Sequence, residues 1–102
     1  MAILTKSEIR IILDEIEGWE ISESRPEIMR RLKFSDFNEA FSFMTAIALK
    51  AESMKHHPAW HHKYNRLDIT LTTHDEGGVT AMDISLARFI NKVYKGQGLT
   101  LD

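Results

Sequence analysis

The sequence predicts an α+β fold in which a four-stranded antiparallel sheet carries three helices on one face, in the order α-β-β-α-β-β-α. Three observations support this prediction. Three segments place apolar residues at helical spacing, four shorter segments read as strands, and the strands fall into two pairs joined by turn residues. Paired strands favour hairpins, and amphipathic helices need a sheet to cover.

The first helix is expected to begin at Thr5, because Thr5 and Glu8 have the spacing of a capping box. Gly18 is placed to end it. Between them, four apolar residues lie on one stripe: Ile9, Ile12, Leu13 and Ile16.

The first hairpin is predicted over residues 18–23 and 27–34, around the turn Ser24-Arg25-Pro26. The second of these strands contains Arg30 and Arg31. We interpret the two arginines as part of a solvated face rather than a basic binding patch.

Ser35 is expected to cap a second helix over residues 36–54. Its apolar stripe comprises Phe37, Ala40, Phe41, Met44, Ile47, Ala48 and Ala51. Phe43 and Leu49 lie off this stripe. They indicate either a broad buried face or an apolar contact with another subunit.

The second hairpin follows Pro58, which disfavours helical geometry at the residue before it. Its strands are predicted over residues 59–63 and 67–73. After the turn at Gly77-Gly78, Thr80 and Asp83 repeat the capping-box spacing and begin a third helix. That helix carries Leu86, Phe89, Ile90 and Val93 on one stripe and is expected to stop near Gly96.

The composition limits the class of protein. A chain of 102 residues with 43% apolar content is expected to form one domain over residues 1–102. Its first eight residues lack the basic segment and the apolar run typical of a signal peptide, and no run of about 20 apolar residues occurs, so we expect a cytoplasmic protein without membrane contact. The absence of cysteine excludes disulfides and thiol chemistry, and a net charge of −2 argues against direct nucleic-acid binding.

All five histidines lie between positions 56 and 74. Histidine exchanges protons near neutral pH, because its unperturbed pKa is about 6.5. His56 and His57 precede Pro58 at a helix-to-strand junction, and the second hairpin could bring His74 back beside them. His61 and His62 lie within a strand and are interpreted as surface residues.

The residue types leave few chemistries for this cluster. A metal site would lack both the HExxH spacing and a carboxylate at a recognised distance, so we expect none. There is no GxSxG motif, phosphate loop or dinucleotide glycine pattern. Proton transfer on a small ligand remains, with Trp60 as an aromatic wall.

The motif residues resemble a known family, the pterin-4a-carbinolamine dehydratases. They are the run from Glu52 to Trp60, which contains His56-His57-Pro58, followed by Tyr64-Asn65, by residues 69–75 with Thr73-His74-Asp75, and by Gly78-Val79-Thr80 with Asp83. The likeness extends upstream to Gly18-Trp19 and to residues 34–44. These enzymes are also called 4a-hydroxytetrahydrobiopterin dehydratases, and animal members double as the dimerisation cofactor of a homeodomain transcription factor.

The resemblance implies dehydration of 4a-hydroxytetrahydrobiopterin to quinonoid dihydrobiopterin, in tetrahydrobiopterin recycling. It implies a hydro-lyase that uses His56, His57 and His74 in acid/base catalysis, with the pterin as substrate and no cofactor. The implied substrate-binding residues are Glu52, Pro58, Trp60, Thr73, Asp75, Glu76 and Asp83. Asp83 has an equal claim as a helix cap.

This sequence has Lys55 just before the histidine pair, where animal members of the family have an acidic residue. The resemblance also implies a homodimer or homotetramer. The alternative function is a regulatory, protein-binding module like the dimerisation cofactor, with a vestigial pterin site. A metal-binding protein ranks third.

Overall fold

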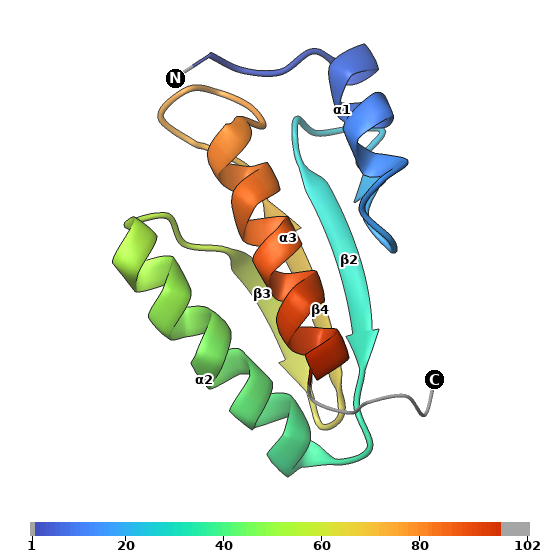
Figure 1. The fold of residues 1–102 in the computed structure, drawn as a ribbon, viewed down its shortest axis with the longest axis vertical. Coiled ribbons are helices and arrows are strands. Elements are labelled where there is room, and N and C mark those ends of the chain that lie inside the picture. Colours follow the sequence, from blue (N-terminus) through green and yellow to red (C-terminus); the bar gives the residue numbers. More distant parts are fainter. Residues whose placement is uncertain (1, 97–102) are drawn as a thin grey trace.

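The computed structural model describes residues 2–96 and confirms the predicted α+β fold and element order (Figure 1). The helices are α1 (Lys6–Leu13), α2 (Phe37–Met54) and α3 (Ala81–Gly96). The strands are β1 (Glu20–Ile21), β2 (Ile28–Lys33), β3 (Ala59–Lys63) and β4 (Arg66–Leu71). No helix in the described part of the chain is long and apolar enough to cross a membrane.

The four strands form one antiparallel sheet in the order β1-β2-β4-β3. β2 pairs with β4 from Ile28↔Leu71 to Lys33↔Arg66, and β3 pairs with β4 from Ala59↔Thr70 to Lys63↔Arg66. Figure 1 shows α2 and α3 lying across one face of the sheet, with α1 beside its β1 end. Within residues 2–96, no helix covers the opposite face of the sheet.

The core lies between the sheet and the helices that cover it. β4 alternates exposed or half-buried residues with buried ones, as expected for a strand with one covered face. Burial of apolar side chains from the sheet and from α2 and α3 supplies the main stabilising free energy. The largest fully buried apolar side chains are Ile28, Phe43, Ile47, Leu67, Ile69, Leu71, Val79, Leu86 and Ile90.

The predicted capping box of α1 is present. Glu8 N–H donates to Thr5 Oγ1 at 3.1 Å, and Thr5 N–H donates to Glu8 Oε1 at 2.8 Å. The helix is shorter than expected, because it ends at Leu13 with Asp14 as its C-cap, well before Gly18. Ile16 is nevertheless buried in the core.

The N-cap of α2 is Asp36, so the prediction of Ser35 as the cap was wrong. Asp36 has an extended backbone, and its Oδ1 accepts from Glu39 N–H at 2.9 Å. A carboxylate suits this position because it also interacts favourably with the positive end of the helix dipole. Ser35 contributes from outside, since its N–H donates to Glu39 Oε1 at 3.0 Å.

The buried face of α2 differs from the predicted stripe. Phe43, expected off the stripe, is fully buried and packs 5.2 Å from the ring of Phe34. Phe37 and Phe41, expected on it, are 46% and 54% exposed. The helix has two apolar stripes, and the stripe that contains Phe43 packs against the sheet. Leu49 is 69% exposed and lies on neither stripe.

Arg30 is only partly solvated, which corrects our interpretation of Arg30 and Arg31 as one exposed pair. Arg30 donates to Asn91 Oδ1 and lies 5.1 Å from the ring centre of Tyr94. Burial lowers its pKa, while Tyr94 and Glu17 act in the opposite direction. Arg31, the next residue along β2, is exposed on the open face of the sheet.

Candidate active site

The end of α2 determines where the first two histidines point. Lys55 adopts the left-handed conformation (φ 54°) and closes the helix. The His56 N–H then donates to Ala51 O at 3.0 Å, a contact that turns the chain sharply toward β3. As a result His56 is 8% exposed, whereas the side chain of His57 is 63% exposed.

A tight loop between β4 and α3 carries His74. The carbonyl oxygen of Thr73 accepts from Glu76 N–H at 3.1 Å and from Gly77 N–H at 2.9 Å, and Thr73 N–H donates to Gly78 O at 2.9 Å. Gly77 has φ 82°, a conformation that glycine adopts without strain. The loop therefore holds His74 and its neighbour Asp75 exposed beyond the end of β4.

The pairing of β3 with β4 brings the two segments together around one cleft of about 240 Å³. It is lined by Lys55, His56, His57, Thr72, Thr73, His74 and Asp75. The three histidines singled out in the sequence thus share one cleft. Thr72 was not predicted, and only its position before Thr73 could have drawn attention to it.

Asp83 lies behind His56. Its Oδ1 is 2.5 Å from His56 Nε2, and Asp83 has no exposed surface. Its Oδ2 accepts from Thr73 Oγ1 at 2.7 Å and from Thr80 N–H at 2.9 Å. The contact with Thr80 is half of the expected capping box. Asp83 therefore joins the start of α3, the β4–α3 loop and His56.

His57 has a partner of a different kind. Its Nε2 lies 2.8 Å from Glu52 Oε1, one turn back on α2, and the Glu52 side chain is 77% exposed. Water screens this pair, so it orients the imidazole with little contribution to stability.

Several residues expected at the site lie outside the cleft lining. Trp60 is on the covered side of β3, opposite Ile69, and packs against the core. Pro58 and Glu76 do not line the cleft either. Their roles, like that of Glu52, stay predictions.

The two other histidines lie along β3. His61 is exposed opposite Asp68. His62 is tilted against Phe37 with the ring centres 5.2 Å apart, and neither histidine lines the cleft.

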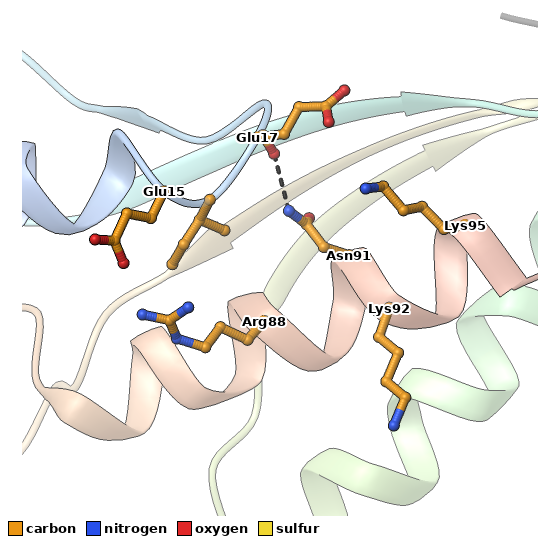
Figure 2. A pocket seen from close by; sticks show the side chains of 7 residues that line it. Glu15, Glu17, Arg88, Asn91, Lys92 and Lys95 are labelled. Atoms are coloured by element: carbon orange, nitrogen blue, oxygen red, sulfur yellow. Dashed lines mark hydrogen bonds between the residues drawn. The ribbon is translucent and has the colours of Figure 1, made fainter.

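A larger cleft of about 320 Å³ lies between α3 and the segment that joins α1 to β1 (Figure 2). Figure 2 shows Asn91 reaching across it, where its side-chain amide donates to Glu17 O at 3.0 Å. The lining consists of Glu15, Ile16, Glu17, Arg88, Asn91, Lys92 and Lys95. None of these residues has an unperturbed pKa near 7, so this cleft is a poorer candidate for acid/base chemistry.

The fold and the cleft define a class: a small α+β protein with three histidines gathered at one end of an antiparallel sheet, an arrangement suited to proton transfer. Among residues 2–96, no group of three or more His, Asp or Glu side chains is placed to hold a metal ion.

The chain belongs to the pterin 4 alpha carbinolamine dehydratase family, whose model matches residues 2–93. A Burkholderia orbicola protein provisionally named as a pterin-4-alpha-carbinolamine dehydratase is 53% identical over 88 residues, which are 86% of each chain. A crystal structure from Brucella melitensis, described as a transcriptional coactivator/pterin dehydratase, matches with a TM-score of 0.87 and 47% identity. That match covers 89% of this chain and 97% of the other.

A more distant structure shares the fold. It is described as a pterin dehydratase-like protein that acts as a RuBisCO assembly factor in the alpha-carboxysome, and it is 18% identical with a TM-score of 0.65. The match covers 76% of this chain and 89% of that protein.

Proposed function

We propose that the protein removes water from a 4a-hydroxytetrahydropterin, such as 4a-hydroxytetrahydrobiopterin, and so serves tetrahydrobiopterin recycling as a hydro-lyase. The observation that carries this proposal is the meeting of His56, His57 and His74 in one cleft of a chain that belongs to the dehydratase family.

The reaction requires only acid and base catalysis. The bond between C4a and the hydroxyl oxygen breaks, N5 loses its proton, and a C4a=N5 double bond forms. The hydroxyl leaves as water after it gains a proton. No electrons are gained or lost, so a base at N5 and an acid at the hydroxyl suffice, and the proposal includes no metal or redox cofactor.

We assign the base to His56. Its Nε2 is engaged by the Asp83 carboxylate, which leaves Nδ1 as the ring nitrogen available to the substrate. When His56 takes the N5 proton, the adjacent carboxylate stabilises the imidazolium that forms, as in other carboxylate-histidine pairs. Asp83 is therefore a positioning residue that acts through His56 rather than by touching the pterin.

His57 and His74 are the candidates for the acid. Both side chains are exposed, so whichever donates a proton to the hydroxyl can recover one from water before the next turnover. Thr73 and Asp75 in the lining can hydrogen-bond the polar edge of a pterin. Glu52, Pro58, Trp60 and Glu76 complete the set of proposed substrate-binding residues.

The test follows the disappearance of chemically generated 4a-hydroxytetrahydropterin, with spontaneous dehydration as the baseline. We expect His56→Ala, His57→Ala and His74→Ala each to slow the catalysed reaction by about a hundredfold or more. His61→Ala, which changes an exposed histidine outside the cleft, is the matched control. Folded cleft variants that turn over at the wild-type rate would rule out the proposal.

A regulatory protein-binding module is the second candidate function. It is favoured by the descriptions of two structural neighbours, a transcriptional coactivator/pterin dehydratase and an assembly factor. Wild-type protein that leaves the spontaneous rate unchanged, yet forms a stable complex with a partner protein, would favour this function over the dehydratase.

We also propose that the protein is a homodimer or homotetramer. Three large apolar side chains of α2 are exposed in the single chain, namely Phe37, Phe41 and Leu49. Sedimentation velocity should show an oligomer that Leu49→Asp weakens. Ser7→Asp, the same kind of change at an exposed position of α1, should have a smaller effect. A wild-type monomer at micromolar concentration would refute this arrangement.

A further inference from the structure

Three basic residues stand side by side across the sheet, and we call them the basic row. Arg66 of β4 is directly opposite Lys33 of β2 on one side and directly opposite Lys63 of β3 on the other. Directly opposed residues of antiparallel strands have Cα atoms about 4.5–5.5 Å apart. The sheet therefore fixes three positive charges as immediate neighbours.

The basic row lies on the open face of the sheet. Successive residues of a strand point to opposite faces, and Leu67, next to Arg66, is fully buried, so Leu67 faces the core and Arg66 faces away from it. Lys33, Lys63 and Arg66 are all exposed. Their side chains thus extend into solvent on the face that α2 and α3 leave uncovered (Figure 1).

No carboxylate of residues 2–96 forms an ion pair with Lys33, Lys63 or Arg66. Like charges directly opposite one another destabilise a sheet. The acidic residue of β4 on this face, Asp68, stands one row away between Arg31 and His61. The basic row is therefore an uncompensated concentration of positive charge in a chain whose net charge is −2.

We propose that the basic row binds a phosphate group of a small ligand. The guanidinium of Arg66 offers a planar fork that matches two phosphate oxygens, and a lysine on each side adds a flexible point charge. The Cα atoms of Lys33 and Lys63 are about 10 Å apart, because each lies one strand spacing from Arg66. The three side chains can therefore converge on one compact dianion.

The surroundings favour a compact phosphate over a nucleic-acid strand. A strand of phosphodiesters needs a continuous positive track, but the next row on this face, Arg31, Asp68 and His61, places a carboxylate at its centre beside Arg31. The row beyond it, Met29, Thr70 and Ala59, is uncharged. Neither of these two rows contains a Phe, Tyr or Trp, and the exposed ring of Tyr64, next to Lys63 in the β3–β4 turn, offers one stacking platform rather than a series of them.

The basic row and the histidine cleft occupy opposite ends of the β3–β4 hairpin. Arg66 begins β4, whereas Thr72 and Thr73 of the cleft follow its last residue, Leu71. Five residue steps separate the two ends of this strand, a distance of about 17 Å. Binding at the basic row is therefore separable from dehydration in the cleft.

The test measures the Kd of the full chain for pyrophosphate and for phenyl phosphate by calorimetry at low ionic strength. We expect Arg66→Gln to weaken binding about tenfold or more, and Lys33→Gln and Lys63→Gln to weaken it by smaller factors. Arg10→Gln removes the same charge from the exposed surface of α1 and should leave Kd unchanged. Binding of pyrophosphate alone identifies an inorganic ligand, and binding of phenyl phosphate identifies a phosphate ester.

A second measurement, of the Tm, tests the repulsion among the three positive charges of the basic row. Without ligand, Lys33→Gln and Lys63→Gln should raise the Tm, and saturating pyrophosphate should raise the Tm of the wild type more than that of either variant. The proposal is overturned if wild type binds neither probe, if Arg10→Gln weakens binding as much as Arg66→Gln, or if a single-stranded oligonucleotide binds more tightly than both phosphates.

Discussion

His56 Nε2 and Asp83 Oδ1 are 2.5 Å apart, although 27 residues separate them in the sequence. Asp83 is fully buried and His56 is 8% exposed. A buried carboxylate is costly unless several donors satisfy it, and Asp83 meets this condition through Thr73 and Thr80. This pair connects the fold to the proposed chemistry.

Replacing Asp83 by Asn keeps the size of the side chain and removes its negative charge. We expect kcat to fall by about a hundredfold while KM changes little, because the carboxylate supports the protonated form of His56 and does not touch the pterin. Steady-state kinetics and the pH profile of kcat check this expectation.

A purely structural role for Asp83 would give a different pattern. Asp83→Asn would then lower the Tm and the yield of active protein, but the folded fraction would keep the wild-type kcat and pH profile. That outcome would contradict the positioning role.

Thr73 tests the same network from the loop. Thr73→Val removes the hydroxyl that donates to Asp83 Oδ2 at 2.7 Å and contacts Thr80 Oγ1 at 2.8 Å. We expect the free energy of unfolding to fall by about 1–3 kcal/mol, since a buried acceptor loses a donor. Thr73→Ser keeps the hydroxyl and should retain most of the stability, as urea denaturation would show. Equal losses in both variants would place the effect in packing instead.

Lys55 is a non-glycine residue in the left-handed region, at φ 54°. Lys55→Gly should raise the free energy of unfolding by about 0.5–1 kcal/mol. Glycine removes about 1–2 kcal/mol of backbone strain from the folded state. It also makes the unfolded chain more flexible, which costs about 0.4–1 kcal/mol of stability, so the net effect is stabilising. Lys55→Ala keeps the β-carbon and should be close to neutral. If Lys55→Ala raises the free energy of unfolding as much as Lys55→Gly does, the cause is the loss of the positive charge near the histidines and not the relief of backbone strain.

Asn91 connects α3 to the segment before β1 and to Arg30 of β2. Its Oδ1 accepts from Trp19 Nε1 at 2.9 Å and from the half-buried guanidinium of Arg30, and its amide donates to Glu17 O. Asn91→Ala should lower the free energy of unfolding by about 2 kcal/mol or more, because the two donors lose their acceptor.

The control for Asn91 is its neighbour on α3. Lys92→Ala changes an exposed residue of the same cleft and should stay within about 0.5 kcal/mol of wild type. Comparable losses from the two variants, measured by urea denaturation, would show that Asn91 contributes only as a helix residue.

Local patterns predicted much of this fold because local physics decides it. The capping box at Thr5 and Glu8 and the backbone contact between Thr80 and Asp83 involve groups three residues apart. The alternation of β4 also reports directly on its single covered face. The gathering of three histidines at one cleft followed from the antiparallel hairpin that joins their segments.

The rest depended on long-range packing. α2 has two apolar stripes, and only contact with Phe34 and Tyr94 decides that Phe43 is buried. Strand alternation places Arg30 on the face of Ile28 and Leu32, but its partial burial depends on Asn91, a partner 61 residues away. Asp83 was recognised as a cap, but its contact with His56 depends on how α3 lies over the sheet.

The loop after β4 also bears on how the family can diverge. Thr73 is bonded at one end of this loop to Gly78 through the backbone and to Asp83 through its hydroxyl, so both flanks are anchored. Substitutions at Asp75 or Glu76, whose side chains are exposed, leave these anchors in place. An insertion or deletion would move His74 relative to His56. We therefore expect the family to keep the length of this loop constant, even at positions where a change of residue leaves the fold intact.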